Sequence, residues 1–302
     1  MVIKNFDELI EKVSSFKDRK KVAVVAAHDE HTLQAVFRAK DDRLVEPVLI
    51  GDKREIHKIL EENEFSIDEE SIIDIKNDKE AAYKAVEMIN ENSADFIMKG
   101  KIQTADLLKA VVDKEKGIRT GKLMSHFAML EVPTYHKLLV VTDGGMVMYP
   151  TLEEKKEIIE NAVSILLSLG YEYPRVGVLA AVEKVNPKMP ESVDAAELKK
   201  MAERGEIGNC IVEGPISYDL AMNMESARIK GYESPVVEDV DILVVPNIAA
   251  GNILAKSLIY SGNAKMAGII VGAKVPIVLT SRGASSEEKY LSLALSAAVN
   301  LK

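Results

Sequence analysis

The chain has 302 residues, of which 47% are hydrophobic, and a formal net charge of −9. A chain of this length can bury a large core, and two domains are a reasonable expectation. The negative charge argues against nucleic acid as a general partner, because contact with phosphates requires a basic surface. A single cysteine, Cys210, excludes a disulfide framework and a thiolate metal cluster, and it fits a reducing cytoplasm.

Residues 1–16 alternate charged and apolar residues at helical spacing and lack the apolar core of a signal peptide. No apolar run approaches the roughly 18 residues that are needed to span a bilayer. We therefore expect a soluble, acidic protein of the cytoplasm that does not contact a membrane.

Short apolar runs bounded by Gly, Pro and Asp alternate with helical patterns along the chain. The predicted strands are 21–28, 46–51, 94–100, 136–143, 175–182, 208–214, 240–247, 266–272 and 275–280. Helical spacing of apolar residues is clearest at 103–114, 152–169 and 248–261. Continuous apolar strands that alternate with helices are typical of an α/β fold with a mostly parallel sheet. Turns at 129–138 and 268–275 are the predicted domain boundaries.

In open α/β sheets, ligands collect at the carboxyl ends of the strands. The segment from Lys99 to Lys122 follows one such end and carries seven basic and three acidic residues, a local balance of +4. Lys99, Lys101 and Thr104 lie between the strand and the next helix, where free backbone N–H groups and the helix dipole favour an anion. The alternative is a solvated helix face with Thr104 as an ordinary cap.

Two further strand ends carry polar or flexible residues. Asn247, Gly251 and Asn252 follow one strand, where they favour either close approach of a ligand or a capping Asn followed by helix packing. Tyr149 follows another strand and either lines an apolar pocket or belongs to the core. Shortly after it, Thr151 and Glu154 have the spacing of a capping box.

The last predicted strand is followed by Ser281, Arg282 and Gly283. An arginine at this position is well placed for bidentate contact with phosphate. Ser285 and Glu288 have the spacing of a capping box at the start of an amphipathic helix, so Glu288 has a structural explanation whether or not it reacts.

Several arrangements are missing from the sequence. No P-loop, no dinucleotide-binding glycine pattern and no Gly-x-Ser-x-Gly elbow is present. His28 and His31 do not have the spacing of a zinc-binding helical pair, and we interpret Asp29 as a helix cap. Cys210 lies in an apolar strand and is expected to be inert. The sequence therefore lacks an evident nucleophile for a covalent intermediate, and it predicts no metal site.

Four segments in this order resemble the phosphate acetyltransferase/phosphate butyryltransferase family, and the butyryl branch most closely. They are "MKGKIQTADLL", "EGPISYDLAM", "VPNIAAGNILAKSL" and "LTSRGASSEEK", and together they extend the resemblance over essentially the whole chain. The resemblance implies an isopropylmalate-dehydrogenase-like fold with two α/β domains and an active cleft between them. Domain I would be 1–133 plus 273–302 and domain II 134–272.

The resemblance also implies a homodimer or higher homo-oligomer that transfers a short acyl group reversibly between coenzyme A and inorganic phosphate. Butyryl is favoured, and neither a metal nor a permanently bound cofactor is implied; coenzyme A is a substrate. The family's catalytic serine and arginine fall on Ser281 and Arg282. Its catalytic carboxylate falls on Glu288, where the acetyltransferases generally carry Asp. Lys99, Lys101 and Arg119 are proposed in place of the family's other active-site arginines.

In the expected reaction, Glu288 takes the proton of the coenzyme A thiol as the sulfur attacks an acyl phosphate. Ser281 orients the thiol or donates to the oxyanion, and Arg282 stabilises the negative charge. Lys101 and Thr104 hold the phosphate. The alternatives are a phosphate acetyltransferase, an acyltransferase that serves acyl-carrier protein, and a non-enzymatic sensor of coenzyme A or organic phosphates. A metal-dependent dehydrogenase is disfavoured, because the sequence shows no cluster of aspartates.

Overall fold

The computed structural model describes residues 2–281 and 283–300. The chain forms two compact units: unit 1 comprises residues 1–6, 123–266 and 300–302, and unit 2 comprises residues 7–122 and 267–299. Both units contain segments that are distant in the sequence. The domain assignment made from the sequence, with its exact boundaries, stays a prediction.

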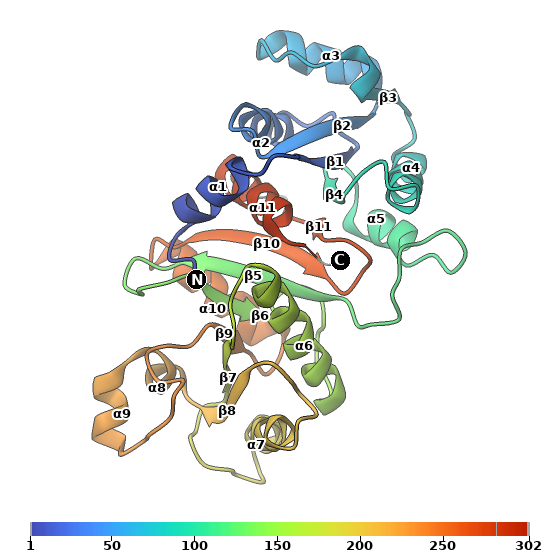
Figure 1. Ribbon diagram of the computed structural model, residues 1–302. Coiled ribbons are helices and arrows are strands. Elements are labelled where there is room, and N and C mark those ends of the chain that lie inside the picture. The colour runs from blue at the N-terminus through green and yellow to red at the C-terminus, as the bar shows by residue number, and fades with distance from the viewer. Residues whose placement is uncertain (1, 282, 301–302) are drawn as a thin grey trace. The chain divides into compact units, whose positions relative to one another are not determined.

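Unit 2 contains residues 7–122 and the C-terminal helix of the chain (Figure 1). Its strands are β1 (Lys20–Val25), β2 (Val45–Gly51), β3 (Ile72–Asp74), β4 (Phe96–Lys99), β10 (Lys265–Val271), which begins in unit 1, and β11 (Ile277–Val278). Its helices are α1 (Phe6–Ser14), α2 (Glu30–Asp41), α3 (Lys53–Glu62), the short η1 (Glu69–Ser71), α4 (Asp78–Asn90), α5 (Thr104–Val111) and α11 (Ser286–Ala298).

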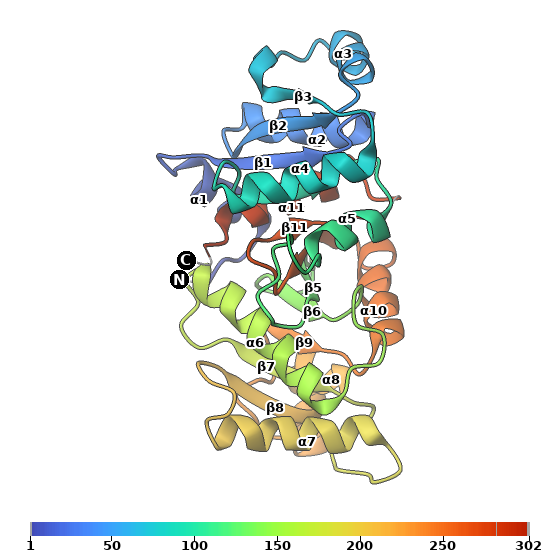
Figure 2. The same cartoon turned by 90° about the vertical axis from the view of Figure 1, so that its right-hand side faces the viewer.

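The strands of unit 2 are ordered β3-β2-β1-β4-β11-β10. All neighbours are parallel except β10 and β11, which are antiparallel. Helices α2 and α11 pack together on one face of this sheet, and α4 and α5 pack together on the other (Figures 1 and 2). With both faces covered, the central strands are apolar throughout, as the burial of Val22 to Val25 shows.

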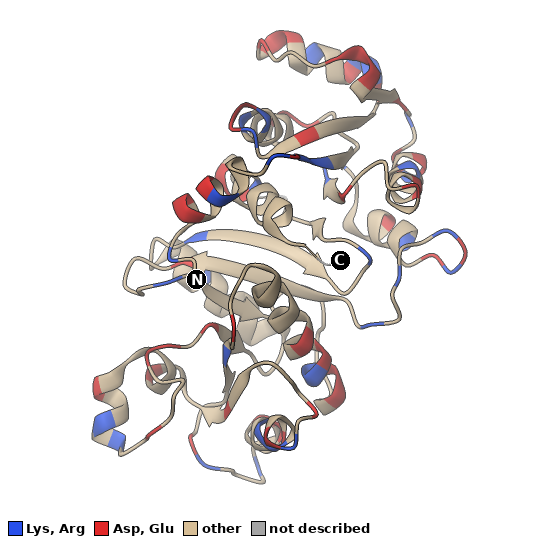
Figure 3. Ribbon diagram, in the orientation of Figure 1, with Lys and Arg blue, Asp and Glu red and all other residues tan. Residues whose placement is uncertain are grey.

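Unit 1 contains the strands β5 (Ser125–Glu131), β6 (Leu139–Thr142), β7 (Arg175–Leu179), β8 (Ile211–Ile216) and β9 (Ile242–Val244). Its helices are α6 (Leu152–Ser168), α7 (Pro190–Glu203), α8 (Tyr218–Met222), α9 (Met224–Lys230) and α10 (Ile248–Tyr260). The strand order is β5-β6-β9-β7-β8, and only the β5–β6 pair is antiparallel. Helices α6 and α10 lie on opposite sides of the sheet (Figure 2). Figure 3 shows that charged residues gather on the helices and loops, while most of each strand is uncharged.

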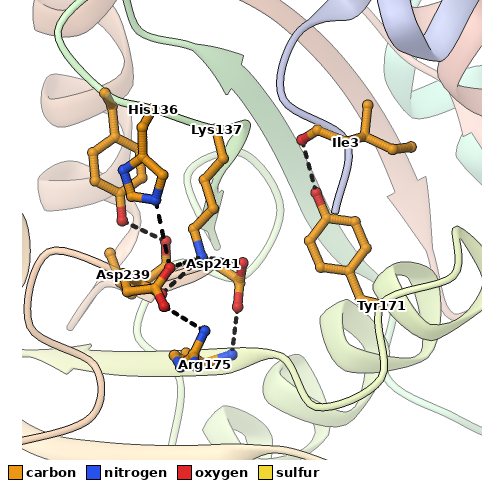
Figure 4. A network of polar contacts seen from close by, with 9 residues as sticks. Ile3, His136, Lys137, Tyr171, Arg175, Asp239 and Asp241 are labelled. Carbon is orange, nitrogen blue, oxygen red and sulfur yellow. Dashed lines mark hydrogen bonds and ion pairs between the residues drawn. The ribbon is translucent and has the colours of Figure 1, made fainter. Parts of the chain in front are cut away.

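A buried lysine fixes the amino ends of three strands of unit 1 (Figure 4). Lys137 precedes β6 and is 3% exposed. Its Nζ donates to the carbonyl oxygen and Oδ1 of Asp239, at 2.8 and 2.7 Å, and to Oδ1 of Asp241 at 2.7 Å. Asp241 in turn accepts from the backbone N–H of Arg175, the first residue of β7, at 2.7 Å. All three ammonium hydrogens are used, so this network is a structural element at the edge opposite the carboxyl ends of the parallel strands.

The predicted elements agree with the structure apart from two strands. Each of the nine predicted strands overlaps an observed one, and the three named helices correspond to α5, α6 and α10. β3 was missed because three residues give no periodicity, and β5 because its end was included in the turn predicted at 129–138. The predicted class, a mostly parallel α/β fold, is confirmed. In the described part of the chain, no helix has the length and apolar character that a bilayer crossing requires.

Candidate functional site

The strand order of unit 2 defines one place where its parallel strands diverge. From β1 the chain proceeds to β2 and β3 on one side of the sheet, while β4 lies on the other side of β1. Connections that leave in opposite directions open a crevice at the carboxyl ends of the two central strands. A ligand site is therefore expected after Val25 and Lys99, where β1 and β4 end.

A cavity of about 250 Å³ lies at this position. Its lining comes from the segments that follow β1, β4 and β11 and from the first turn of α11: Asp29, Lys99, Gly100, Lys101, Ile102, Gln103, Thr280, Ser281 and Lys289. Three predicted site residues, Lys99, Lys101 and Ser281, are thus brought together although up to 182 positions separate them in the sequence. All of the lining residues belong to unit 2.

The chain leaves β4 close against the end of β1. The N–H groups of Gly100 and Lys101 donate to the carbonyl oxygens of Val25 and Ala26 at 2.8 and 2.9 Å. A Cβ on Gly100 would lie 2.6 Å from the Val25 oxygen and closer still to that of Ala26, so glycine is needed here. The expectation that these N–H groups are free for an anion is wrong, because the neighbouring strand uses them. Positive charge at this wall comes instead from the lysine side chains.

Helix α5 begins at the cavity. Gln103, a lining residue, holds the N-cap position, and Thr104 is the first helical residue rather than the cap. The alternative interpretation of Thr104 as an ordinary cap is therefore wrong. Thr104 is exposed and is not among the residues that line the cavity within the described chain.

Ser281 has a local structural role as well as a place in the cavity. Its Oγ accepts from the N–H of Gly283 at 3.2 Å, and its carbonyl oxygen accepts from Ala284 at 3.1 Å, which closes the turn after β11. A hydroxyl that accepts one hydrogen bond can still donate its own proton to a ligand. Arg282, the predicted phosphate-binding arginine, lies outside the described residues.

The predicted cap at the start of α11 is present. Ser285 is the N-cap residue, and its Oγ accepts from the N–H of Glu288 at 3.1 Å. Glu288 is partly buried in the first helical turn. It is not among the residues that line the cavity within the described chain, but the next residue, Lys289, is.

Asp29 and Lys289 form the side of the cavity that faces α2 and α11. Asp29 is the N-cap of α2, as predicted, and accepts from the N–H of Thr32 at 2.9 Å and from the Thr32 hydroxyl. The Nζ of Lys289 lies 3.3 Å from Oδ2 of Asp29 and 3.3 Å from Oγ1 of Thr32. Burial alone raises the pKa of Asp29, but the hydrogen bonds from Thr32 and the charge of Lys289 outweigh it, and the net shift is downward. Asp29 is therefore ionised at neutral pH.

The other predicted binding residues, Asn247, Gly251, Asn252 and Tyr149, belong to unit 1. Asn247 caps α10 by accepting from the N–H of Ala250 at 3.1 Å. A Cβ on Gly251 would lie 2.8 Å from Gly144 Cα, and Asn252 Nδ2 donates to the Gly144 carbonyl at 3.3 Å.

These contacts hold the segment that follows β6 against the start of α10, which gives the predicted residues of α10 a packing role. Tyr149, in that segment, is 79% exposed, so its assignment to the core is wrong.

Arg119, also in unit 2, is not among the described residues that line the cavity. It forms an isolated antiparallel bridge with Ala273 and is exposed. Cys210 lies just before β8 and not within the strand as predicted. Burial, with a contribution from Glu160, raises the pKa of its thiol to about 11. The thiol is therefore protonated at neutral pH, in agreement with the prediction of an inert cysteine. Among the residues that the structure describes, no three His, Cys, Asp or Glu side chains are grouped to hold a metal ion.

Comparison with known proteins identifies the family. The family model described as phosphate acetyl/butaryl transferase matches residues 76–297. The chain belongs to this family. A phosphate butyryltransferase from Clostridium acetobutylicum is 44% identical over 99% of both chains. A phosphate acetyltransferase from Thermotoga maritima is 46% identical over 92% of this chain and 94% of its own.

The fold of this chain also matches that of a solved relative. The crystal structure of a branched-chain phosphotransacylase from Enterococcus faecalis aligns with a TM-score of 0.81 and 36% identity, and covers 92% of this chain and 98% of its own. The predicted family is thereby confirmed. Ser281 and the lysines around it thus belong to a chain whose relatives are named phosphate butyryltransferase and phosphate acetyltransferase.

Sequence reasoning missed Lys289 and predicted Asp29 only as a cap. For Asp29, its place directly after the first strand was a usable signal, since ligand sites follow strand ends. For Lys289, the signal was a lysine in the first turn of a helix, where the dipole disfavours a cation. Neither signal shows that the two residues meet, because 260 positions separate them.

Proposed function

We propose that this member of the family transfers a short-chain acyl group reversibly between coenzyme A and inorganic phosphate, giving acyl phosphate and coenzyme A. The observation that carries the proposal is the lysine-rich cavity around Ser281 at the carboxyl ends of β1 and β4. Its volume of about 250 Å³ is below the roughly 300–1,000 Å³ of typical ligand pockets, so it suits a phosphate group rather than a whole coenzyme.

In the proposed reaction, Glu288 acts as a general base. The coenzyme A thiol resembles a free cysteine with a pKa of roughly 8.5, so only a few per cent is thiolate at neutral pH. Glu288 accepts the thiol proton as the sulfur attacks the carbonyl carbon of the acyl phosphate. The C–O bond to phosphate then breaks, and phosphate leaves with its electron pair. No covalent bond to the protein forms.

Ser281 and Arg282 stabilise the charge that develops in this reaction. The Ser281 hydroxyl donates to the developing oxyanion or orients the thiol, while its oxygen holds the turn through Gly283. The Arg282 guanidinium neutralises the oxyanion or the departing phosphate. One such preorganised donor is typically worth roughly 3–4 kcal/mol in the transition state.

In this proposal, different predicted residues bind different parts of the substrates. Lys99 and Lys101 bind phosphate in the cavity. Thr104, which begins α5 and is not among the described lining residues, contacts the phosphate or coenzyme A outside the cavity. We assign Arg119 and the unit 1 residues Asn247, Gly251, Asn252 and Tyr149 to coenzyme A and the acyl chain. The exposed ring of Tyr149 is available for an apolar contact with a ligand.

Butyryl is our preferred acyl group, and acetyl is the second candidate. The butyryltransferase and acetyltransferase relatives are 44% and 46% identical to this chain, so overall similarity does not separate the two. One or two methylenes change discrimination by only about 1–3 kcal/mol. We further propose that the enzyme is a cytoplasmic homodimer with two domains as predicted, and that it needs neither a metal nor a bound cofactor.

A thiol-release assay with purified protein tests the function directly. Butyryl-CoA and acetyl-CoA are each mixed with inorganic phosphate, and free thiol is followed by its reaction with a chromogenic disulfide. We expect phosphate-dependent thiol release, with a higher kcat/KM for butyryl-CoA. The Arg282→Ala variant is expected to lose about 100-fold or more in kcat. Thiol release that does not depend on phosphate would indicate a hydrolase and overturn the proposal. A wild-type protein without activity that still binds coenzyme A would favour the sensor.

A further inference from the structure

Lys289 occupies an unfavourable position for a lysine. It lies in the first turn of α11, and its side chain is only 9% exposed. A cation near a helix N-terminus opposes the helix dipole, and a buried charge is costly unless it is closely paired. The contacts of its Nζ with Asp29 and Thr32, both at 3.3 Å, are long for charge-assisted hydrogen bonds.

The carboxylate beside Lys289 is already engaged. Oδ2 of Asp29, the atom nearest to Lys289, also accepts from the N–H and the hydroxyl of Thr32. Three lysines, Lys99, Lys101 and Lys289, line the cavity, whereas Asp29 is the only acid among its described lining residues. The described wall of the cavity therefore has more positive than negative charge, which is the condition for binding an anion.

Another buried lysine, at the equivalent position of a different helix, provides the contrast. Lys155 occupies the same place in α6, four residues after the N-cap, and its side chain is 7% exposed. Its Nζ contacts Asp194 at 2.7 Å, a normal charge-assisted distance. Lys155 is thus paired closely with a carboxylate, and Lys289 is not.

We propose that Lys289 is a substrate-binding residue that holds a phosphoryl group in this cavity. An ammonium has three N–H donors. Two of these donors point to Asp29 and Thr32, which position the ammonium group, and the third donates to a phosphate oxygen. The proposal rests on the proposed acyl transfer for its substrate, which supplies the phosphoryl group either as inorganic phosphate or as part of coenzyme A.

The test compares Lys289→Met with Lys155→Met in phosphate-free buffer. Calorimetric titration with inorganic phosphate, without any acyl substrate, measures the dissociation constant. We expect a rise of about tenfold or more for Lys289→Met, equivalent to about 1.4 kcal/mol, and no more than twofold for Lys155→Met. Because this titration needs no acyl transfer, its outcome does not depend on whether the proposed function is correct.

Steady-state kinetics then separate the two sources of the phosphoryl group. If inorganic phosphate is the source, Lys289→Met raises the KM for phosphate and leaves that for coenzyme A unchanged. If a phosphate of coenzyme A is the source, only the KM for coenzyme A rises, and phosphate titration is unaffected. The proposal is overturned if Lys289→Met matches Lys155→Met in the phosphate dissociation constant and in both KM values.

A second variant covers the case in which Lys289→Met does not fold. Lys289→Gln keeps a polar group for Asp29 and Thr32 but carries no charge, so it should show the same loss of phosphate binding. On the wild type, ¹⁵N NMR of the lysine ammonium groups should show a phosphate-dependent shift for Lys289 and none for Lys155. An unshifted Lys289 signal at saturating phosphate and coenzyme A would contradict its role.

Discussion

The first turns of α6 and α11 are built from nearly the same residues but face different surroundings. Residues 151–155 read "TLEEK" and residues 285–289 read "SSEEK". In α6, Thr151 and Glu154 form a complete reciprocal capping box, and Lys155 is closely paired with Asp194. In α11, Ser285 caps Glu288, and the lysine that follows lines the cavity of about 250 Å³. One sequence pattern thus serves stability in unit 1 and, as we propose, chemistry in unit 2.

The largest difference is expected between the two glutamates. Glu288→Gln should reduce kcat by about 100-fold, because an amide cannot accept the thiol proton. Glu154→Gln should leave kcat unchanged, since the amide serves the capping box of α6 nearly as well. The measurement is thiol release by both variants under the same conditions, with the melting temperature as a folding check. Near-normal turnover by Glu288→Gln would show that Glu288 is not the general base and has only a structural role in α11.

The two lysines should also differ in their contribution to stability, and here the substitution of Lys155 should have the larger effect. Lys155→Met breaks a close buried ion pair and leaves Asp194, 27% exposed, without its cation, which should cost about 3 kcal/mol. Lys289→Met should cost only about 1 kcal/mol, because Asp29 keeps its two hydrogen bonds from Thr32. Urea unfolding followed by circular dichroism gives both values. A larger loss for Lys289→Met would show that its contact with Asp29 is chiefly structural.

The smallest effect concerns the stability of the protein at low pH, through Asp29 in the cavity. The pKa of Asp29 is below its usual 3.8 in the folded protein, so its ionised form stabilises the fold above that pH, and this stabilisation is lost as pH falls through the folded pKa. Asp29→Asn keeps a good cap but removes the charge. We expect the variant to be less stable at pH 6 by roughly 1 kcal/mol or less, since Asp29 is partly exposed. The gap should narrow as pH falls below 3.8 and through the lowered pKa of Asp29, and a gap independent of pH would contradict this assignment.

Much of the fold could be predicted because its signals are local. Apolar runs marked nine strands, and the caps Asp29, Thr151 and Ser285 were read from residue type and spacing alone. Strand-end reasoning selected Lys99, Lys101 and Ser281, which line one cavity. It failed at Gly100 and Lys101, where the available N–H groups are taken by a neighbouring strand that is distant in the sequence.

The sequence by itself determined the α/β class, the helix caps and the family, since these depend on periodicity, short-range hydrogen bonds and motif order. Only the tertiary structure decided what each capped helix faces. Lys155 and Lys289 follow the same pattern, yet one meets Asp194 and the other meets Asp29 and the cavity. The physical reason is strand order: β1, β4 and β11 become neighbours through parallel pairing over long sequence distances, and no local pattern records that pairing.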